Sequence, residues 1–452
     1  MASRGRTIAA IALRRLSRAL LEARLGLVRG HNRRIIFARQ ARLACEALGP
    51  TFIKLGQLAS VRPDVFAPET VFEMERLQDR VPAVPAAEIE AIMERELGRP
   101  ARGLLTGLSV APSATASIAQ VHRAVLARDY RPVQGATLPA GTPLAVKMVR
   151  PGVEAAIDAD LALARRWAVR LEKFARLARW RPAALLTEFE HTLAGELDLR
   201  NEGRAADRLA RDFADDPRVV VPRVVWPLTT RRVLVTEFIE GWRLNDLGAA
   251  ERAGIDARGL AAHGAEVFMR QVLVHGRYHA DLHPANLFVT PDSRICYLDF
   301  GIVGHTTPLQ RIAIAQVLVA TVYGDADRAL RYSRELGLEI PARHEAAVRA
   351  RVAELMQRNL RGPGQADIRG FALGFLEMLA DFRIPIPSGY GLLVKALVTV
   401  EGVARAIYPD IDIVESARPF ATRLIAAQLA RPERLRERLP EALRAALQAL
   451  AA

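Results

Sequence analysis

The spacing of hydrophobic and polar positions alternates between helical and β character along the 452-residue chain. Apolar residues recur at helical spacing through residues 1–110, where prolines interrupt the pattern repeatedly after residue 60. Two short runs of β character follow at Ile118–Val125 and Leu144–Val149, with a turn-rich segment between them. This arrangement predicts an antiparallel hairpin that follows a helical region.

Helical spacing returns from Val153 to about Asp212, and we expect one amphipathic helix over Arg165–Arg181. Val219–Val225 and Arg232–Phe238 are predicted to form a further strand pair. Everything after about residue 302 is predicted to be helical, apart from a proline-rich break at Ile384–Ser388. The order predicts an α+β fold with two lobes, in which a small β-containing lobe precedes a mostly helical one.

The pattern divides the chain into five predicted regions. They are a basic amphipathic helical region (1–48), an N-terminal helical extension (49–110), the β-containing lobe with inserted helices (111–240), the helical lobe (241–430) and an Ala/Arg-rich helical tail (431–452).

The first 48 residues carry many arginines but only two acids, Glu22 and Glu46. Such a helix can lie on an anionic membrane, act as an organelle-type presequence, or be a solvated helix that covers the domain. No run approaches the roughly 20 apolar residues that a membrane span requires. The chain has only two cysteines, Cys45 and Cys296, which we interpret as the reduced thiols of a cytoplasmic protein. Because the chain has no span but has a basic helical region, we expect it to be peripherally associated with the inner face of the membrane.

The formal net charge of +14 indicates a polyanionic partner, such as a nucleotide or an anionic membrane surface. We do not expect a nucleic acid, because aromatics make up only 6% of the chain and are not interleaved with basic residues.

Lysine is scarce, with four among 64 basic residues, which leaves 64 − 4 = 60 arginines. The lysine side chain ends in a compact ammonium, whereas that of arginine ends in a planar guanidinium. A lysine in this arginine-rich chain therefore suggests a site that needs the compact charge. We interpret Lys173 as a surface residue of the predicted 165–181 helix.

Residues 279–301 hold the strongest chemical pattern of the chain. Asp281 and Asn286 have the spacing of the acid and the amide in the protein-kinase catalytic loop, and Asp299 opens an Asp-Phe-Gly sequence after them. Asp281 is therefore a candidate base, and Asn286 and Asp299 are candidate Mg²⁺ ligands. His283 stands where protein kinases usually have lysine, and we interpret His279 as structural.

Lys147 is the one cation in the apolar strand predicted at 144–149. A lysine there is costly unless it is paired, and kinases pair it with nucleotide phosphates and a helix glutamate. Glu196 and Glu202, placed on the following helix, are both candidate partners; an edge-strand lysine in solvent is the alternative.

Two features of protein kinases are missing. The loop before Lys147, which includes Ala114, Thr115, Ala116, Ser117 and Ile118, has no glycine, and no Ala-Pro-Glu or long activation segment follows Gly301. A platform for peptide substrates is therefore not expected.

Together, these motifs resemble the UbiB (AarF, ADCK) family of atypical kinase-like proteins. The residues that carry the resemblance are Lys54-Leu55-Gly56-Gln57, Arg62-Pro63-Asp64, Leu77-Gln78-Asp79, the Ala114–Gln120 loop, Val146-Lys147, Glu196-Leu197-Asp198, the 279–286 loop, Asp299-Phe300-Gly301 and Glu401-Gly402-Val403.

The resemblance implies a protein-kinase-like core with an N-terminal helical extension over the active site. Lys54 and Gln57 would then project into the pocket, towards Glu196 or the phosphates, and Lys147 would pair with Glu202. It implies binding of ATP or ADP with Mg²⁺, ATPase rather than protein-kinase activity, and support of ubiquinone or other prenyl-lipid biosynthesis. The residues that it implies for nucleotide binding are Lys147, Ala114, Thr115, Ala116, Ser117, Ile118, Glu237, Asn286 and Asp299.

Three functions follow from these observations. The first is an atypical kinase or ATPase at a membrane surface, with a lipid or quinone precursor and quinone-biosynthesis enzymes as partners. The second is a nucleotide-binding scaffold for a biosynthetic complex that barely turns over. The third is a small-molecule phosphotransferase of the aminoglycoside or choline kinase type, whose loop is nearly the one in this chain.

Overall fold

A computed structural model shows two compact units. The first comprises Met1–Gly241 and Phe288–Gly301, and the second comprises Trp242–Leu287 and Ile302–Ala452. The structure describes residues 2–25, 31–60, 66–77, 83–132, 135–174, 181–244, 248, 254–282, 284–360, 367–413, 419 and 422–423. The five predicted regions stay predictions, because the two compact units do not test their boundaries, and the tail predicted at 431–452 lies outside the described residues.

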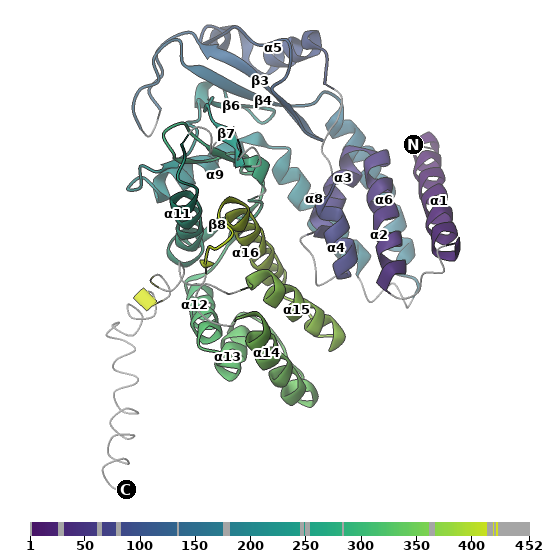
Figure 1. Cartoon of the computed structure of the whole chain (residues 1–452). Helices are drawn as coiled ribbons and strands as arrows, with labels where there is room; N and C mark the ends of the chain where they lie inside the picture. The colour runs from purple at the N-terminus through teal and green to yellow at the C-terminus, as the bar shows by residue number, and fades with distance from the viewer. Residues whose placement is uncertain are drawn as a thin grey trace. The chain divides into compact units, whose positions relative to one another are not determined.

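The first unit begins with helices (Figure 1). They are α1 (Ala2–Leu25), α2 (His31–Leu48), α3 (Pro50–Ser60), α4 (Pro68–Glu75) and α5 (Ala86–Arg102). The helices that follow the hairpin are α6 (Val153–Leu171), α8 (Pro182–Glu196) and α9 (Leu199–Asp212). Lys173 lies in a turn beyond α6, so the continuous helix predicted over 165–181 is wrong at this point.

The first unit also contains an antiparallel sheet in the order β1-β3-β4-β6, with β2 paired to β3. Its strands are β1 (Leu105–Thr106), β2 (Ala114–Thr115), β3 (Ala119–Leu126), β4 (Pro143–Val149) and β6 (Val233–Glu237). The predicted hairpin is thus confirmed as β3 and β4. In β4 the side chains of Leu144, Val146 and Met148 are fully buried, because alternate residues of a strand face the same side.

Helix α5 lies across the face of the sheet that these residues form (Figure 1). Ile89, Ile92 and Met93 of α5 join the strand residues in one buried cluster. The opposite face of β4 carries Lys147, whose register partners are Val121 on β3 and Leu234 on β6. The lysine therefore stands in a central strand and not on a sheet edge.

The pairing predicted between Val219–Val225 and Arg232–Phe238 is only partly correct. β5 (Val219–Val220) pairs in parallel with β10 (Ile295–Tyr297), which follows β9 (Leu287–Val289). Only Val224 forms a bridge with Thr236 of β6, just before the short helix η1 (Trp226–Leu228). Val219 thus has its ladder partner, Ile295, 295 − 219 = 76 positions later in the sequence.

The second unit is mostly helical, as predicted. It contains β7 (Trp242–Arg243), α11 (Ala257–Met269), η3 (Arg270–His275), β8 (Arg277–His279), η4 (Pro284–Asn286), β11 (Val303–His305), α12 (Pro308–Val322), α13 (Ala326–Glu335), η5 (Ala342–His344), α14 (Glu345–Asn359), α15 (Ile368–Asp381) and α16 (Ser388–Ile407). One strand departs from the prediction, because β11 pairs antiparallel with β8 just after residue 302.

Local sequence explains where these helices start. Thr307 caps α12 in a reciprocal capping box with Gln310, and Pro308 occupies the first turn, where its missing N–H costs nothing. The buried carboxylate of Glu401 accepts hydrogen bonds from the backbone N–H groups of Ile368 and Arg369 at the start of α15. Glu401, the first residue of the Glu401-Gly402-Val403 motif, is therefore a helix cap supplied by α16.

Helix α1 is joined to two other helices of the first unit by one buried acid. Asp160 of α6 is 2% exposed; it accepts two hydrogen bonds from the guanidinium of Arg4 and one from the hydroxyl of Thr51 in α3. Because a buried carboxylate is costly without partners, these bonds hold α1 and α3 against α6.

Gly56 lies where α3 packs against α4. A Cβ atom added there would lie 2.3 Å from Leu77 and 3.1 Å from Met74, both buried in one small apolar cluster with Ala59. The glycine of the Lys54–Gln57 motif therefore permits close helix packing.

Replacing Gly56 by valine should lower the free energy of unfolding by about 1–3 kcal/mol, because the two γ-methyl groups overpack this cluster. Urea denaturation of the purified variant measures the change. Gly195→Val is the matched control, because a Cβ at Gly195 would have no described atom within 4 Å other than those of its chain neighbours and its own helix backbone. Equal losses for both variants would contradict the packing explanation.

Candidate active site

In the first unit, Lys147 of β4 forms an ion pair with Glu202 of α9. The ammonium donates to both carboxylate oxygens at 2.8 Å, and the two side chains are 20% and 11% exposed. The backbone N–H of Phe300 also hydrogen-bonds to Glu202. The pairing expected from the family resemblance is therefore present, and the solvent-exposed edge-strand alternative for Lys147 is wrong.

Asp299 contributes a second carboxylate to the same ammonium. Its Oδ2 lies 3.4 Å from the Lys147 Nζ, while its side chain remains 48% exposed. Its backbone has φ 52°, a left-handed conformation that is costly for a residue other than glycine and that tends to occur at functional sites. The Gly301 N–H donates to Asp299 Oδ1 at 3.1 Å, which fixes the carboxylate at the start of the turn.

Burial alone would lower the pKa of the Lys147 ammonium, but the charges of Asp299 and Glu202 outweigh that effect and raise the pKa above its usual range. Lys147 is therefore a permanent cation. A fixed cation beside a half-exposed carboxylate is a suitable binding site for a phosphate chain together with its metal.

Lys54 and Glu196 form a second ion pair in this unit, with Nζ 2.7 Å from Oε2. Gln57 lies one turn after Lys54 on α3, so both project from the same side of that helix. Of the partners suggested for Lys54, Glu196 is the one that the structure shows.

The sequence suggested that Glu196 and Glu202 lie on one helix, and this prediction is wrong. Glu196 ends α8, whereas Glu202 lies in the first turn of α9, and Asp198 between them is the N-cap of α9. The Asp198 carboxylate accepts from the Arg200 backbone N–H at 3.2 Å and from its guanidinium, which lowers the pKa of this carboxyl. The break between the helices separates the two glutamates, so each pairs with its own lysine.

Gly203 brings α9 close to the sheet. A Cβ at this position would meet Leu234 of β6 and Trp226 at 3.2 Å each. The absent side chain thus allows the neighbouring Glu202 to reach Lys147.

The glycine-free loop is a tight hairpin. Ala114 and Thr115 form β2, and the Ala116 N–H donates to the Ala119 carbonyl at 2.8 Å. Ile118 and Ser117 are buried, and the Ser117 hydroxyl has no hydrogen-bond partner within the part of the chain that the structure describes. A buried hydroxyl of this kind fits a loop that contacts a polar ligand.

The side chain of Glu237 is already engaged. Its carboxylate forms a bidentate pair with Arg223, both N–O distances being 2.8 Å. Contact of a nucleotide with Glu237 therefore stays a prediction that would involve its backbone at the end of β6.

In the second unit, Asp281 and Asn286 lie in one loop after β8. The Asn286 amide nitrogen donates to the Asp281 carbonyl at 3.1 Å, which leaves the amide oxygen as the atom suited to a metal. The Asp281 N–H donates to Nδ1 of the buried His279 at 3.2 Å, in agreement with a structural role for this histidine. His283 lies outside the described residues.

Sequence reasoning missed Lys395 as a site residue. It belongs to α16, and its Nζ lies 3.8 Å from Asp281 Oδ1. The scarcity of lysine was the one signal that could have drawn attention to it.

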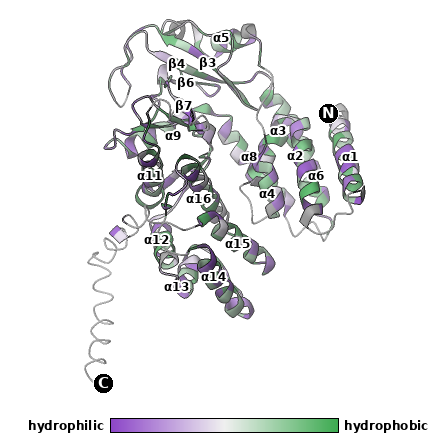
Figure 2. Ribbon diagram, viewed as in Figure 1, coloured by the Kyte–Doolittle hydropathy of each residue, from purple (hydrophilic) through white to green (hydrophobic). Residues whose placement is uncertain are grey.

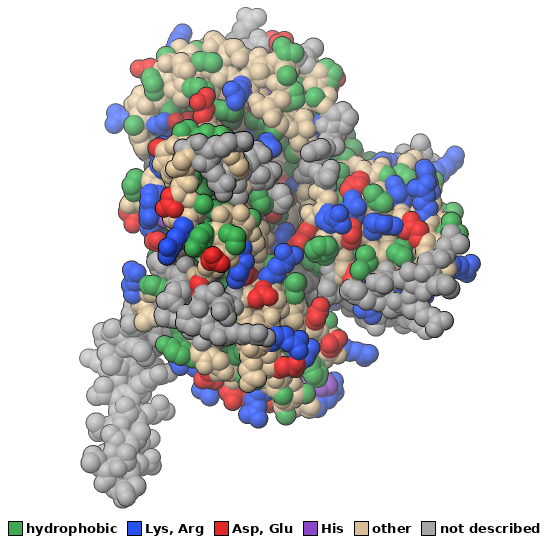
Figure 3. Space-filling model, in the orientation of Figure 1, with side chains coloured by type: hydrophobic (Ala, Val, Ile, Leu, Met, Phe, Trp, Pro, Cys, Tyr) green, Lys and Arg blue, Asp and Glu red, His purple; other side chains and the backbone are tan. Residues whose placement is uncertain are grey.

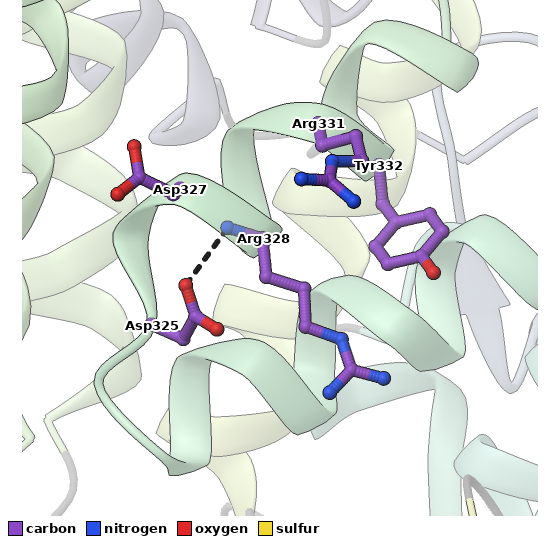
Figure 4. Close-up of a pocket in the computed structure, with 5 residues that line it drawn as sticks. All are labelled: Asp325, Asp327, Arg328, Arg331 and Tyr332. Atoms are coloured by element: carbon purple, nitrogen blue, oxygen red, sulfur yellow. Dashed lines mark hydrogen bonds between the residues drawn. The ribbon is translucent and has the colours of Figure 1, made fainter. Parts of the chain in front are cut away.

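A surface pocket elsewhere in the second unit holds none of the predicted site residues. It is lined by Asp325, Asp327, Arg328, Arg331 and Tyr332 (Figure 4). Asp325 caps α13 through the Arg328 N–H, and the Arg328 side chain bonds Gln316, so these groups have structural roles.

Asp299 in the first unit and Asn286 in the second unit each carry an oxygen of a kind that suits Mg²⁺. Within the described ranges, no three His, Cys, Asp or Glu side chains gather as a metal centre. Mg²⁺ in phosphotransferases commonly takes only one or two protein oxygens and completes its shell with phosphate and water. The carboxylate of Asp299 and the amide oxygen of Asn286 are ligands of that kind.

The Lys147–Glu202 pair makes stability depend on pH in a testable way. Lys147→Met leaves Glu202 buried beside the Asp299 carboxylate, so the variant should lose about 3 kcal/mol at pH 8. Burial and Asp299 raise the folded-state pKa of Glu202, so the folded variant binds a proton more tightly than the unfolded chain. The variant therefore regains stability as the pH falls, and the loss should be smaller at pH 5.

Urea unfolding of wild type and variant at both pH values measures this difference. Lys173→Met, which removes an exposed lysine, is the control. A Lys147→Met penalty that is the same at pH 5 and pH 8 would contradict the interpretation.

The sequence matches two family models. Residues 76–333 match the ABC1 atypical kinase-like domain, and residues 371–412 match the UbiB helical domain.

Curated relatives indicate the same family as the two family models. A probable protein kinase UbiB from Marinobacter nauticus is 35% identical, over 84% of this chain and 68% of its own length. Proteins of the same name from Cellvibrio japonicus and Xanthomonas campestris pv. campestris are 33% and 34% identical; they match 86% and 88% of this chain and 70% and 72% of their own lengths.

Among solved structures, the complex of Rv3197 with erythromycin from Mycobacterium tuberculosis has a similar fold. It aligns with a TM-score of 0.52 and 21% identity, over 82% of this chain and 91% of that one. The protein-kinase-like α+β fold predicted from the sequence is confirmed. With a kinase-like domain model that matches more than half of the chain and relatives at this level of identity, the protein belongs to the UbiB family of atypical kinase-like proteins.

Proposed function

We propose that the chain binds ATP with Mg²⁺ and cleaves its terminal phosphate, in support of ubiquinone or other prenyl-lipid biosynthesis at a membrane surface. The observation that carries this proposal is the buried Lys147–Glu202 pair with Asp299 beside it. In kinases, that lysine contacts the α- and β-phosphates, and the Asp of Asp-Phe-Gly holds the metal.

Each residue has a chemical task in this scheme. Lys147, kept protonated by its carboxylates, would bind the phosphate chain, and Glu202 would fix the direction of its ammonium. Asp299 and Asn286 would hold Mg²⁺, which neutralises charge on the phosphates when bound. Asp281 would accept a proton from the attacking hydroxyl or water.

The proposed acceptor is water or a lipid-like molecule, and proteins are disfavoured. Helix α12 begins at Pro308, so only six residues separate it from Gly301 and no long activation segment exists to bind a peptide. We propose that Lys54 and Gln57 on α3 cover the nucleotide, as the resemblance to the family implies.

Purified protein should release ADP from Mg-ATP, measured with anionic liposomes and a lipid-like phenol present. Asp299→Asn should lower kcat at least about 100-fold, because the metal loses its carboxylate ligand. Glu354→Gln, on an exposed surface of α14, should retain wild-type turnover. Wild-type ADP release no faster than that of Asp299→Asn would rule out the ATPase proposal.

The scaffold alternative is favoured by one observation, the tight hairpin at Ala116–Ala119, which has no glycine for close approach to phosphates. Complementation distinguishes the two functions: a strain that lacks the gene for this protein is given a copy that encodes the Asp281→Asn variant. We expect quinone levels to stay low, because the base is lost. Full restoration of quinone levels would instead support the scaffold.

A small-molecule phosphotransferase is the remaining alternative, but no feature of the structure favours it. If a soluble amino alcohol is added to the ADP-release experiment, transfer of phosphate to it would support this alternative.

The membrane surface is proposed to bind α1. Leu13, Leu16 and Leu20 follow helical spacing and are 70%, 49% and 39% exposed, with the exposed Arg14 and Arg18 among them. Figure 2 shows hydrophilic and hydrophobic residues alternating along α1, and Figure 3 shows basic side chains gathered over α1 and α2. Such a helix suits an anionic lipid interface. None of the described helices is long and apolar enough to cross a membrane.

Replacing Leu13, Leu16 and Leu20 by serine should weaken binding to anionic vesicles about 10-fold or more, because apolar area is removed from the interface. Binding of wild type should also fall as salt rises. Val110→Ser removes an apolar residue elsewhere that is 77% exposed and is the control. These substitutions keep Arg4, whose deletion would leave the buried Asp160 without its cation. Unchanged vesicle binding by the triple variant would dismiss the proposed contact.

A further inference from the structure

The second unit places a lysine from a distant part of the sequence beside the candidate base. Lys395 and Asp281 are 114 positions apart, yet the ammonium lies 3.8 Å from the carboxylate. The Lys395 side chain is 16% exposed, whereas that of Asp281 is 41% exposed. The cation is therefore held by protein, and the carboxylate that it faces is open to a ligand.

The surrounding elements explain how Lys395 reaches this position. Its helix, α16, packs against α11 and against β11. β11 pairs with β8, with Val303 opposite His279, and β8 leads directly into the loop of Asp281. The Ala280 N–H also donates to the Ile302 carbonyl at 3.0 Å, so the start of the loop is tied to the strand against which α16 packs.

The loop itself has no lysine or arginine between Asp281 and Asn286. A cation near the carboxylate must therefore come from elsewhere in the fold. Of the four lysines in the chain, this one stands beside the candidate base, whereas 60 other basic positions hold arginine. The compact ammonium can approach one carboxylate oxygen without the second N–H that an arginine fork would present to the reacting atoms.

We propose that Lys395 is a positioning residue for Asp281, which orients the carboxylate that accepts the acceptor's proton. This inference rests on the proposed function. In that reaction the acceptor oxygen bonds to the γ-phosphorus, its proton passes to Asp281, and the bond from phosphorus to the bridging oxygen breaks to release ADP. The charge of Lys395 favours one rotamer of a carboxylate that is 41% exposed. The helical segment 371–412 thereby takes part in catalysis through one side chain.

The competing explanation is an ordinary ion pair, which contributes little wherever solvent reaches it. The two explanations differ in what happens to turnover. An ordinary ion pair would alter stability alone, whereas a positioning residue acts on kcat and leaves nucleotide affinity unchanged.

The full-length protein with Lys395→Met should show kcat for ADP release about 10- to 100-fold below wild type. Its Kd for Mg-ATP, measured by calorimetry, should stay within about 2-fold, because Lys395 is not assigned to the nucleotide. Lys395→Arg should recover part of kcat, since it restores the charge in another shape. Lys173→Met is the control and should match wild type. Wild-type kcat in Lys395→Met would overturn the proposal.

A double-mutant cycle tests whether Lys395 acts through Asp281. In an Asp281→Asn background, with residual turnover followed by release of labelled phosphate, Lys395→Met should change kcat less than about 2-fold. A full 10-fold effect in that background would mean that Lys395 acts on the substrate directly, and would overturn the proposal. Failure of the ATPase proposal itself is distinguishable, since then wild type would show no turnover above Asp299→Asn.

Discussion

A lysine ammonium on a central strand must have a carboxylate partner, and much of the first unit serves to provide one. Lys147 faces away from the apolar cluster under α5, so its partner has to come from the opposite side of the sheet. Glu202 supplies it because Asp198 starts α9 at the right residue and Gly203 lets that helix approach β6. The second acid of the Glu196–Asp198 motif thus acts as a helix cap that sets the position of Glu202.

The sequence predicted the features that depend on local pattern. The apolar run Leu144–Val149 predicted a strand that contains one lysine, and the spacing of Asp281 and Asn286 predicted one loop that holds both residues. Local pattern could not show that Glu196 and Glu202 belong to two helices, because Leu197 and Asp198 suit a helix as well as a cap.

Non-local pairing explains the remaining differences. Val219–Val220 has strand character, but the residues that complete its ladder lie in β10, so only the later part of the predicted strand, at Val224, pairs with 232–238. Lys395 carries no local signal at all, since its partner is 114 positions away. Ser117 is similar, because its buried hydroxyl becomes notable only once the hairpin around it is known.

Three of the four lysines stand in ion pairs with Glu196, Glu202 and Asp281, and Lys173 is exposed. A kinase-like chain with so few amines can be labelled at only a few sites. Reductive methylation with ¹³C-formaldehyde would give a spectrum of four side-chain resonances and one from the N-terminus. Three of these would report separately on Lys54, Lys147 and Lys395, so that nucleotide, metal and lipid could be titrated while each ion pair is observed on its own.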